Sequence, residues 1–104
     1  MFTELESDNL KSIVDGGKTV VVQYSAGWCG NCRMMKPKFK RMAEEFADIE
    51  FVMVDAEKYP ESRKLAKVDN LPTFATFKGG TLAGQIQTNQ AENLKKFIDE
   101  TATN

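Results

Sequence analysis

Short apolar runs alternate along the chain with stretches whose apolar residues recur at three- and four-residue steps. The apolar runs predict five strands, near 2–3 and over 19–25, 51–54, 73–77 and 81–87. The stretches between them predict four helices, one with an apolar stripe of Leu10, Ile13 and Val14, the others over about 29–46, 60–67 and around Leu94 to Ile98. Ser7 or Asp8 is predicted to cap the first helix.

The order of these elements predicts the fold class. Strand–helix–strand crossovers produce parallel strand pairs, whereas the Gly79-Gly80 pair between the last two strands is typical of an antiparallel hairpin. We therefore expect an α/β sandwich with a mixed central sheet of four to five strands, flanked by about four helices.

Length and charge narrow the class further. The chain has 104 residues, 41% of them hydrophobic, and a net charge of −1 from 14 basic and 15 acidic residues. We expect one domain over 1–104, a monomer, with no membrane span. The near-neutral charge argues against nucleic-acid binding. Because the N-terminus lacks a basic region followed by an apolar stretch, we also expect no secretory signal and a cytoplasmic location.

One local charge imbalance stands out in the segment 33–41. Its basic residues are Arg33, Lys36, Lys38, Lys40 and Arg41, and the acidic Glu44 and Glu45 follow. A solvated helix face explains such a run, and attraction of acidic partners is the functional alternative.

The candidate chemistry lies at the predicted strand-to-helix junction. The only two cysteines, Cys29 and Cys32, follow Trp28 and open the long helix. A disulfide between them closes too short a loop to stabilise the fold much, which favours a reversible redox couple. The helix N-terminus favours a thiolate at Cys29, which makes it the candidate nucleophile, and Cys32, one turn on, is the candidate resolving thiol. The exposed side chain of Trp28 is predicted to shield the thiolate and contact a partner.

A zinc site is the alternative for two cysteines at this spacing. Tetrahedral zinc needs four ligands, and the chain has no histidine and no third cysteine. We therefore expect no metal and no cofactor beyond the reversible disulfide, although a cluster shared by two chains stays open.

The chain resembles the thioredoxin family over essentially its whole length. The resemblance rests on four motifs: the segment from Trp28 through Gly30 to Cys32, Pro37, Leu71-Pro72-Thr73, and Phe77-Lys78-Gly79-Gly80. It implies the thioredoxin fold and a protein-disulfide reductase, with Cys29 as nucleophile, Cys32 as resolving thiol and a cis Pro72 facing them. It also implies protein-disulfide substrates that pair with the backbone near Leu71, and an external reductase such as thioredoxin reductase.

Three positions depart from the family pattern. Asn31 replaces the proline usual between the cysteines, which frees a backbone N–H and is expected to shift the potential of the couple. Gln23 stands where the family usually has a buried aspartate that accepts the proton of the second cysteine, and Met53 replaces a charged residue near it. Thr88 replaces a glycine beside the substrate groove and is expected to narrow partner choice.

These departures keep two alternatives to the reductase. One is a partner-binding, chaperone-like domain on the same fold, for which Gln23 and Thr88 are the support. The other is a dimeric iron–sulfur protein that uses Cys29 from two chains, which the missing proline at Asn31 makes sterically easier.

Overall fold

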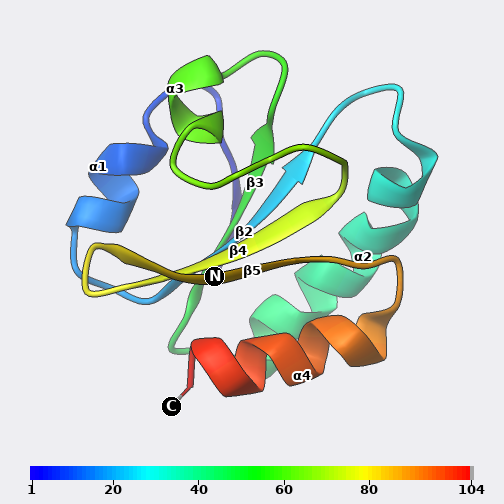
Figure 1. Ribbon diagram of the computed structural model, residues 1–104. Helices are drawn as coiled ribbons and strands as arrows, with labels where there is room; N and C mark the ends of the chain where they lie inside the picture. The colour runs from blue at the N-terminus through cyan, green and yellow to red at the C-terminus, as the bar shows by residue number, and fades with distance from the viewer. Residues whose placement is uncertain (104) are drawn as a thin grey trace.

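The computed structural model describes residues 1–103 and shows a five-stranded sheet between two layers of helices (Figure 1). The strands are β1 (Phe2–Glu4), β2 (Val20–Ser25), β3 (Glu50–Asp55), β4 (Thr73–Lys78) and β5 (Thr81–Gln87). The helices are α1 (Leu10–Asp15), α2 (Gly30–Glu45), α3 (Pro60–Arg63) and α4 (Ala91–Thr101). None of the described helices is long and apolar enough to cross a membrane.

The sheet is mixed, as the sequence predicts. Its strand order is β1-β3-β2-β4-β5, with β1, β3 and β2 parallel and β4 antiparallel to both of its neighbours. Gly79 and Gly80 make the β4–β5 turn with φ of +59° and +83°, a left-handed conformation that glycine adopts without a Cβ clash. The predicted hairpin is therefore confirmed.

Each face of the sheet buries its own apolar cluster. β2 is buried at every position because it lies in the middle of the sheet and both of its faces are covered. Its even-numbered residues, such as Val22 and Tyr24, pack with α1 and the α3 segment, whereas Val21 packs with Phe39 of α2 and Ile98 of α4. Figure 1 shows the same arrangement, with α1 and α3 on one side of the sheet and α2 and α4 on the other. Because β2 ends where α2 begins, this packing fixes the junction that carries the cysteines.

Two predictions on the α1 and α3 side are wrong. The predicted helix over 60–67 is shorter, since α3 ends at Arg63 and only turns follow it. Neither Ser7 nor Asp8 caps α1, whose N-cap is Asn9 without a side-chain hydrogen bond. The Asp8 carboxylate instead accepts hydrogen bonds at the start of α3, from the backbone N–H of Glu61 and Ser62 (3.0 and 2.7 Å) and from the Ser62 hydroxyl (2.6 Å). The Asp8 carboxylate thus pairs with two of the N–H groups that a helix start leaves without a partner, here those of α3.

Replacing Asp8 with asparagine is expected to lower the thermal midpoint at pH 7 by roughly 3–8 °C, because the start of α3 loses its charged acceptor. The Ser62 hydroxyl lowers the pKa of Asp8 in the folded protein. The stabilisation is therefore complete above the ordinary aspartate pKa of about 3.9 and disappears as the pH falls through the lowered value. Thermal unfolding at pH 7 and pH 3 should show the difference between wild type and variant shrinking at the lower pH. The control is Asp15→Asn, which removes an exposed pair with Lys11 and should change little.

Candidate active site

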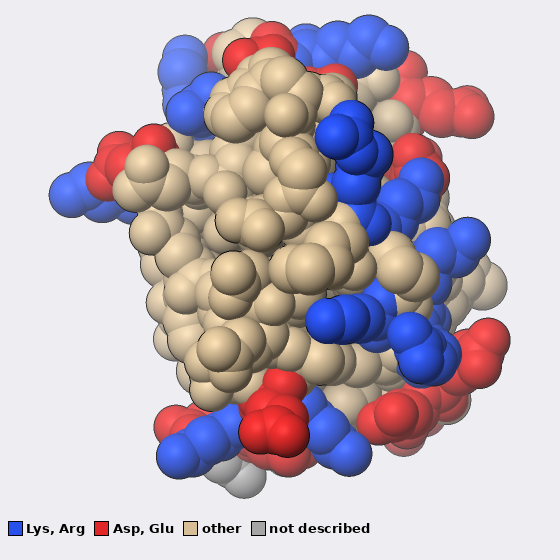
Figure 2. All heavy atoms as spheres, turned by 90° about the vertical axis from the view of Figure 1, so that its right-hand side faces the viewer, with Lys and Arg blue, Asp and Glu red and all other residues tan. Residues whose placement is uncertain are grey.

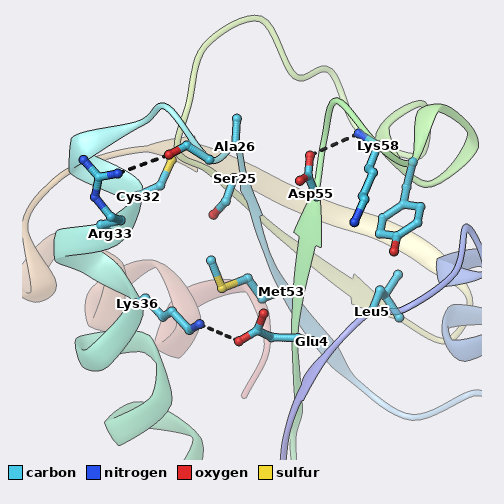
Figure 3. Close-up of a pocket in the computed structure, with 12 residues that line it drawn as sticks. Glu4, Leu5, Ser25, Ala26, Cys32, Arg33, Lys36, Met53, Asp55 and Lys58 are labelled. Atoms are coloured by element: carbon cyan, nitrogen blue, oxygen red, sulfur yellow. Dashed lines mark hydrogen bonds and ion pairs between the residues drawn. The ribbon is translucent and has the colours of Figure 1, made fainter.

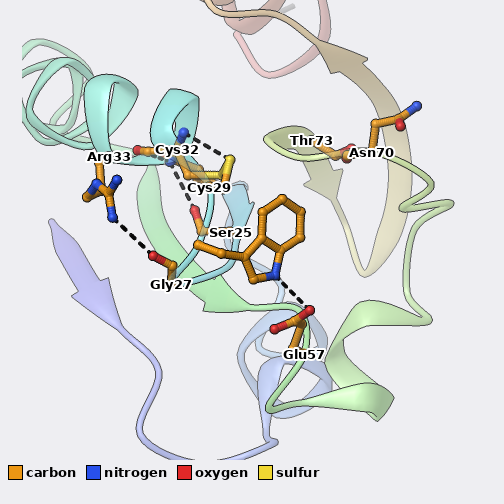
Figure 4. Close-up of a disulfide and its surroundings, with 10 residues drawn as sticks. Ser25, Gly27, Cys29, Cys32, Arg33, Glu57, Asn70 and Thr73 are labelled. Carbon is orange, nitrogen blue, oxygen red and sulfur yellow. Dashed lines mark hydrogen bonds between the residues drawn. A yellow bond between two sulfur atoms is a disulfide. The ribbon is translucent and has the colours of Figure 1, made fainter.

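The two cysteines form a disulfide at the N-terminus of α2 (Figure 4). Cys29 is the N-cap residue, with extended φ and ψ of −86° and 107°, and its Sγ accepts a hydrogen bond from the backbone N–H of Cys32 at 3.2 Å. That N–H is one of the donors left unpaired at a helix start, so it is aimed at the sulfur that would carry the charge in the reduced protein. Both side chains are almost buried, with exposed fractions of 5% for Cys29 and 1% for Cys32.

Trp28 covers the approach to the cysteines. Its side chain is 67% exposed, and its Nε1–H donates a hydrogen bond of 2.8 Å to Glu57 Oε2, as Figure 4 shows. The Glu57 backbone N–H donates in turn to Asp55 at the end of β3. The large apolar ring is therefore held in place while it stays open to a partner. Sequence reasoning missed Glu57, because nothing in its local sequence indicates that it meets a residue on another loop.

A shallow groove lies beside the cysteines, which we call the Pro72 groove. It is lined by Asn31, Asn70, Leu71, Pro72, Gln87, Thr88 and Asn89. The Leu71–Pro72 peptide bond is cis, which confirms that expectation. The groove brings the residue between the two cysteines together with the loop before β4 and the end of β5, three segments far apart in sequence.

Thr88 lies at this groove, but its hydroxyl has a structural partner. Thr88 Oγ1 accepts hydrogen bonds from the backbone N–H of Gln90 (3.1 Å) and from Asn93 Nδ2 (3.3 Å). The side chain therefore ties the turn before α4 as well as lining the groove. Removing it would change both the width of the groove and the start of that helix.

Gln23 is buried directly beneath Cys32. Its exposed fraction is 0%, and its Nε2 donates hydrogen bonds of 3.1 Å both to Ser25 Oγ and to the Cys32 carbonyl oxygen. A carbonyl oxygen only accepts, so the amide nitrogen must face Cys32. Gln23 Oε1 is buried and has no hydrogen-bond partner among residues 1–103. The amide thus anchors the backbone of Cys32, a contact that the sequence did not predict, and it cannot take up a proton.

A second cavity reaches Cys32 from the side of β1 and β3 (Figure 3). We call it the Met53 cavity; its lining includes Glu4, Ser25, Cys32, Arg33, Lys36, Met53, Asp55 and Lys58. Lys36 forms an ion pair with Glu4 across it, and Arg33 Nη1 donates to the Gly27 carbonyl oxygen at 3.1 Å. Ionisable side chains therefore line the cavity that Cys32 borders, although Met53 itself carries no charge.

Comparisons with known proteins agree with this geometry. The thioredoxin family model matches residues 1–100. The chain belongs to the thioredoxin family. Rabbit thioredoxin is 35% identical over 103 residues, covering 96% of this chain and 98% of its own, and rice thioredoxin H2-1 is 40% identical over 82 residues. The match covers 79% of this chain but spans only 59% of the rice protein's length. The reduced thioredoxin of Schistosoma mansoni superposes with a TM-score of 0.87 at 31% identity, covering 96% of this chain and 97% of that one.

Membership in the thioredoxin family settles the fold and the class of reaction. The fold is the thioredoxin fold, and the chain is a thiol–disulfide oxidoreductase with the activity of a protein-disulfide reductase. The matches lend no support to the chaperone-like or iron–sulfur alternatives. Within residues 1–103, no group of three or more His, Cys, Asp or Glu side chains is placed to hold a metal ion.

Proposed function

We propose that Cys29 is the attacking thiol of this reductase and Cys32 the resolving thiol. The observation that carries this assignment is the hydrogen bond from the Cys32 N–H to Cys29 Sγ at the start of α2. A sulfur that receives a helix N–H is stabilised as the thiolate, and the thiolate is the nucleophile. Cys32 is the more buried of the two, beneath its partner and next to the Gln23 amide.

The reaction has two exchange steps. The Cys29 thiolate attacks one sulfur of a protein disulfide, a mixed disulfide forms, and the other target sulfur leaves as a thiolate that takes up a proton. Cys32 then loses its proton and attacks Cys29 Sγ, which releases the second target sulfur and forms the Cys29–Cys32 disulfide. Two electrons have moved to the target, and no cofactor takes part. An external reductase such as thioredoxin reductase then supplies two electrons that reduce the Cys29–Cys32 disulfide back to the dithiol.

Substrate binding uses the Pro72 groove and its border. Trp28 offers exposed apolar area, and the backbone near Leu71 is the edge to which an extended substrate segment adds. Pro72 and Thr88 shape the groove, while Gly30 and Asn31 form the first helical turn between the cysteines. Thr88 narrows the choice of partners because it adds a side chain to the lining of the groove where the family usually has glycine.

The single reactive cysteine pair also guides our proposal for the cellular compartment and the oligomeric state. We place the protein in the cytoplasm, as a monomeric electron carrier in cellular redox homeostasis, because a single reactive pair suits a reducing compartment. The chain over 1–104 acts as one domain, and its partners are proteins rather than nucleic acids or membranes.

Trapping with single-cysteine variants tests the assignment of the two thiols. Reduced Cys32→Ser is expected to accumulate a stable mixed disulfide with a disulfide-containing protein, because the attacking thiol remains and the resolving thiol is absent. Reduced Cys29→Ser should trap almost none, since the remaining thiol is the more deeply buried of the two. Non-reducing electrophoresis and mass spectrometry measure the adduct. The opposite pattern would assign the attack to Cys32.

A further inference from the structure

One surface next to the disulfide, formed by the Pro72 groove and Trp28, is uncharged. Every residue that lines the Pro72 groove is neutral, and Trp28 beside it is neutral and largely exposed. Such a surface can hold a substrate segment through shape and backbone pairing, but it cannot select a partner by charge. Charge selection must therefore come from the border of this surface.

One border of the uncharged surface is strongly basic. The segment 33–41 of α2 contains Arg33, Lys36, Lys38, Lys40 and Arg41 and no acidic residue, and we call this surface the α2 basic face. Figure 2 shows basic side chains gathered in a band along one flank of a broad uncharged area, on the side of the molecule where α2 lies.

Most of this charge is not neutralised within the protein. Lys36 pairs with Glu4, whereas Arg33 donates to a backbone carbonyl and Lys40 lies 5.3 Å above the Phe2 ring. Among the described residues, no carboxylate forms an ion pair with Arg33, Lys38, Lys40 or Arg41. Among residues 1–103, four cations thus stand along the first three turns after the cysteines without an ion pair, which leaves their charge available to a partner.

Lys38 and Arg41 are the two cations of the α2 basic face that line a depression shared with α4. Together with Met42 and Glu45 they line a shallow depression that reaches Ala91, the first residue of α4, and the Glu45 carboxylate pairs with Lys95. Ala91 follows Thr88 and Asn89 of the Pro72 groove by only a few residues. The groove and this depression are thus joined by the short stretch of chain from Asn89 to Ala91.

We propose that the α2 basic face docks an acidic segment of a protein partner whose disulfide lies at the Pro72 groove. The proposal rests on the proposed reductase function and adds the class of substrate. The Trp28 side of the groove offers no excess of positive charge, because Glu57, which holds the Trp28 ring, is followed by Lys58. Acidic residues of the partner are therefore attracted on the α2 side of its cysteine.

A protein, and not a nucleic acid, is the partner that the charges favour. The net charge of the whole chain is −1, so a long polyanion would meet repulsion away from α2. A protein can instead present a short acidic cluster to the basic face alone and bring a disulfide to Cys29 at the same time.

The test compares two charge-reversal variants of equal net charge. Lys38→Glu/Arg41→Glu reverses the basic face, and Lys78→Glu/Lys96→Glu is the matched control at two exposed lysines without ion pairs among the described residues. The substrates are two disulfide peptides of one length, with acidic or basic flanks, and a small neutral disulfide. For the acidic peptide we expect kcat/KM to fall about tenfold or more in the first variant and to stay within about twofold in the control.

Salt and the neutral disulfide separate this proposal from the reductase function. The preference of wild type for the acidic peptide should vanish near 1 M salt, where the screening length is about 3 Å. Turnover of the neutral disulfide should be equal in all three proteins, and its absence in wild type would reject the reductase itself. Equal rates for both peptides, or equal losses in both variants, would overturn the docking proposal. The docking proposal would also be overturned if a short RNA bound wild type but not Lys38→Glu/Arg41→Glu, and wild type showed no preference for the acidic peptide.

Discussion

Reduction of insulin disulfides by a dithiol is expected to fall to the uncatalysed rate when Cys29 is replaced by serine. A hydroxyl at the N-cap of α2 can still accept the hydrogen bond from the Cys32 N–H, so the local structure is preserved. The hydroxyl does not ionise to an equivalent nucleophile and forms no mixed disulfide, so the first exchange step is lost. The turbidity of precipitating insulin chains, followed with and without protein, measures the rate.

The reference for this variant is the reduced wild type, since neither protein then has the disulfide. The two should unfold at similar temperatures, because the serine hydroxyl keeps the N-cap hydrogen bond from the Cys32 N–H. A typical thioredoxin provides the scale of activity. Full activity of Cys29→Ser would show that the catalysed step does not pass through this sulfur.

Replacing Gln23 with aspartate is expected to speed the release of the mixed disulfide at neutral pH about tenfold. The Gln23 amide accepts no proton, so Cys32 must lose its proton to water, to the departing thiolate or through the Met53 cavity. A carboxylate beneath Cys32 would act as a general base for this step. Stopped-flow measurement of product release from a preformed mixed disulfide, between pH 5 and 9, isolates the step.

The same replacement should reduce stability. It removes the two hydrogen bonds that Nε2 donates to Ser25 and to the Cys32 carbonyl, a loss of roughly 1–3 kcal/mol. Burial raises the pKa of the introduced carboxylate, so the folded protein binds more protons than the unfolded one. The variant therefore becomes less stable as the pH rises from about 4 to that raised pKa, and changes no further above it.

Gln23→Asn is the matched control, since asparagine has the size of aspartate and no acid. It should lose similar stability at low pH, show no comparable pH slope, and release the mixed disulfide no faster than wild type. An equal acceleration in both variants would assign the effect to the altered backbone of Cys32 instead of to proton transfer.

The layout of the fold could be predicted because its signals are local. The alternation of apolar runs and the glycine pair after Lys78 are enough to predict the mixed sheet and its hairpin, and the observed β4 (Thr73–Lys78) and β5 (Thr81–Gln87) agree closely. The short helix after Pro60 was predicted too long, because the start signal of proline is clear in the sequence whereas the end at Arg63 depends on packing.

The contacts that shape the site could not be predicted because they join residues far apart in sequence. Asp8 finds its partners in α3, more than fifty positions away, and Trp28 is held by Glu57 across 29 positions. In each case a polar group has several possible local partners, and only the packing of separate elements decides which donor or acceptor it meets.

The sequence by itself determined the fold class, the redox pair and its place at the start of a helix, since periodicity and the spacing of Cys29 and Cys32 are properties of adjacent residues. Only the tertiary structure decided what surrounds that pair. It placed the Gln23 amide on the Cys32 carbonyl, Asn31 beside Pro72 in one groove, and the largely unneutralised α2 basic face along its border. The physical reason is that hydrogen bonding and charge selection depend on distances in space, which the order of residues does not contain.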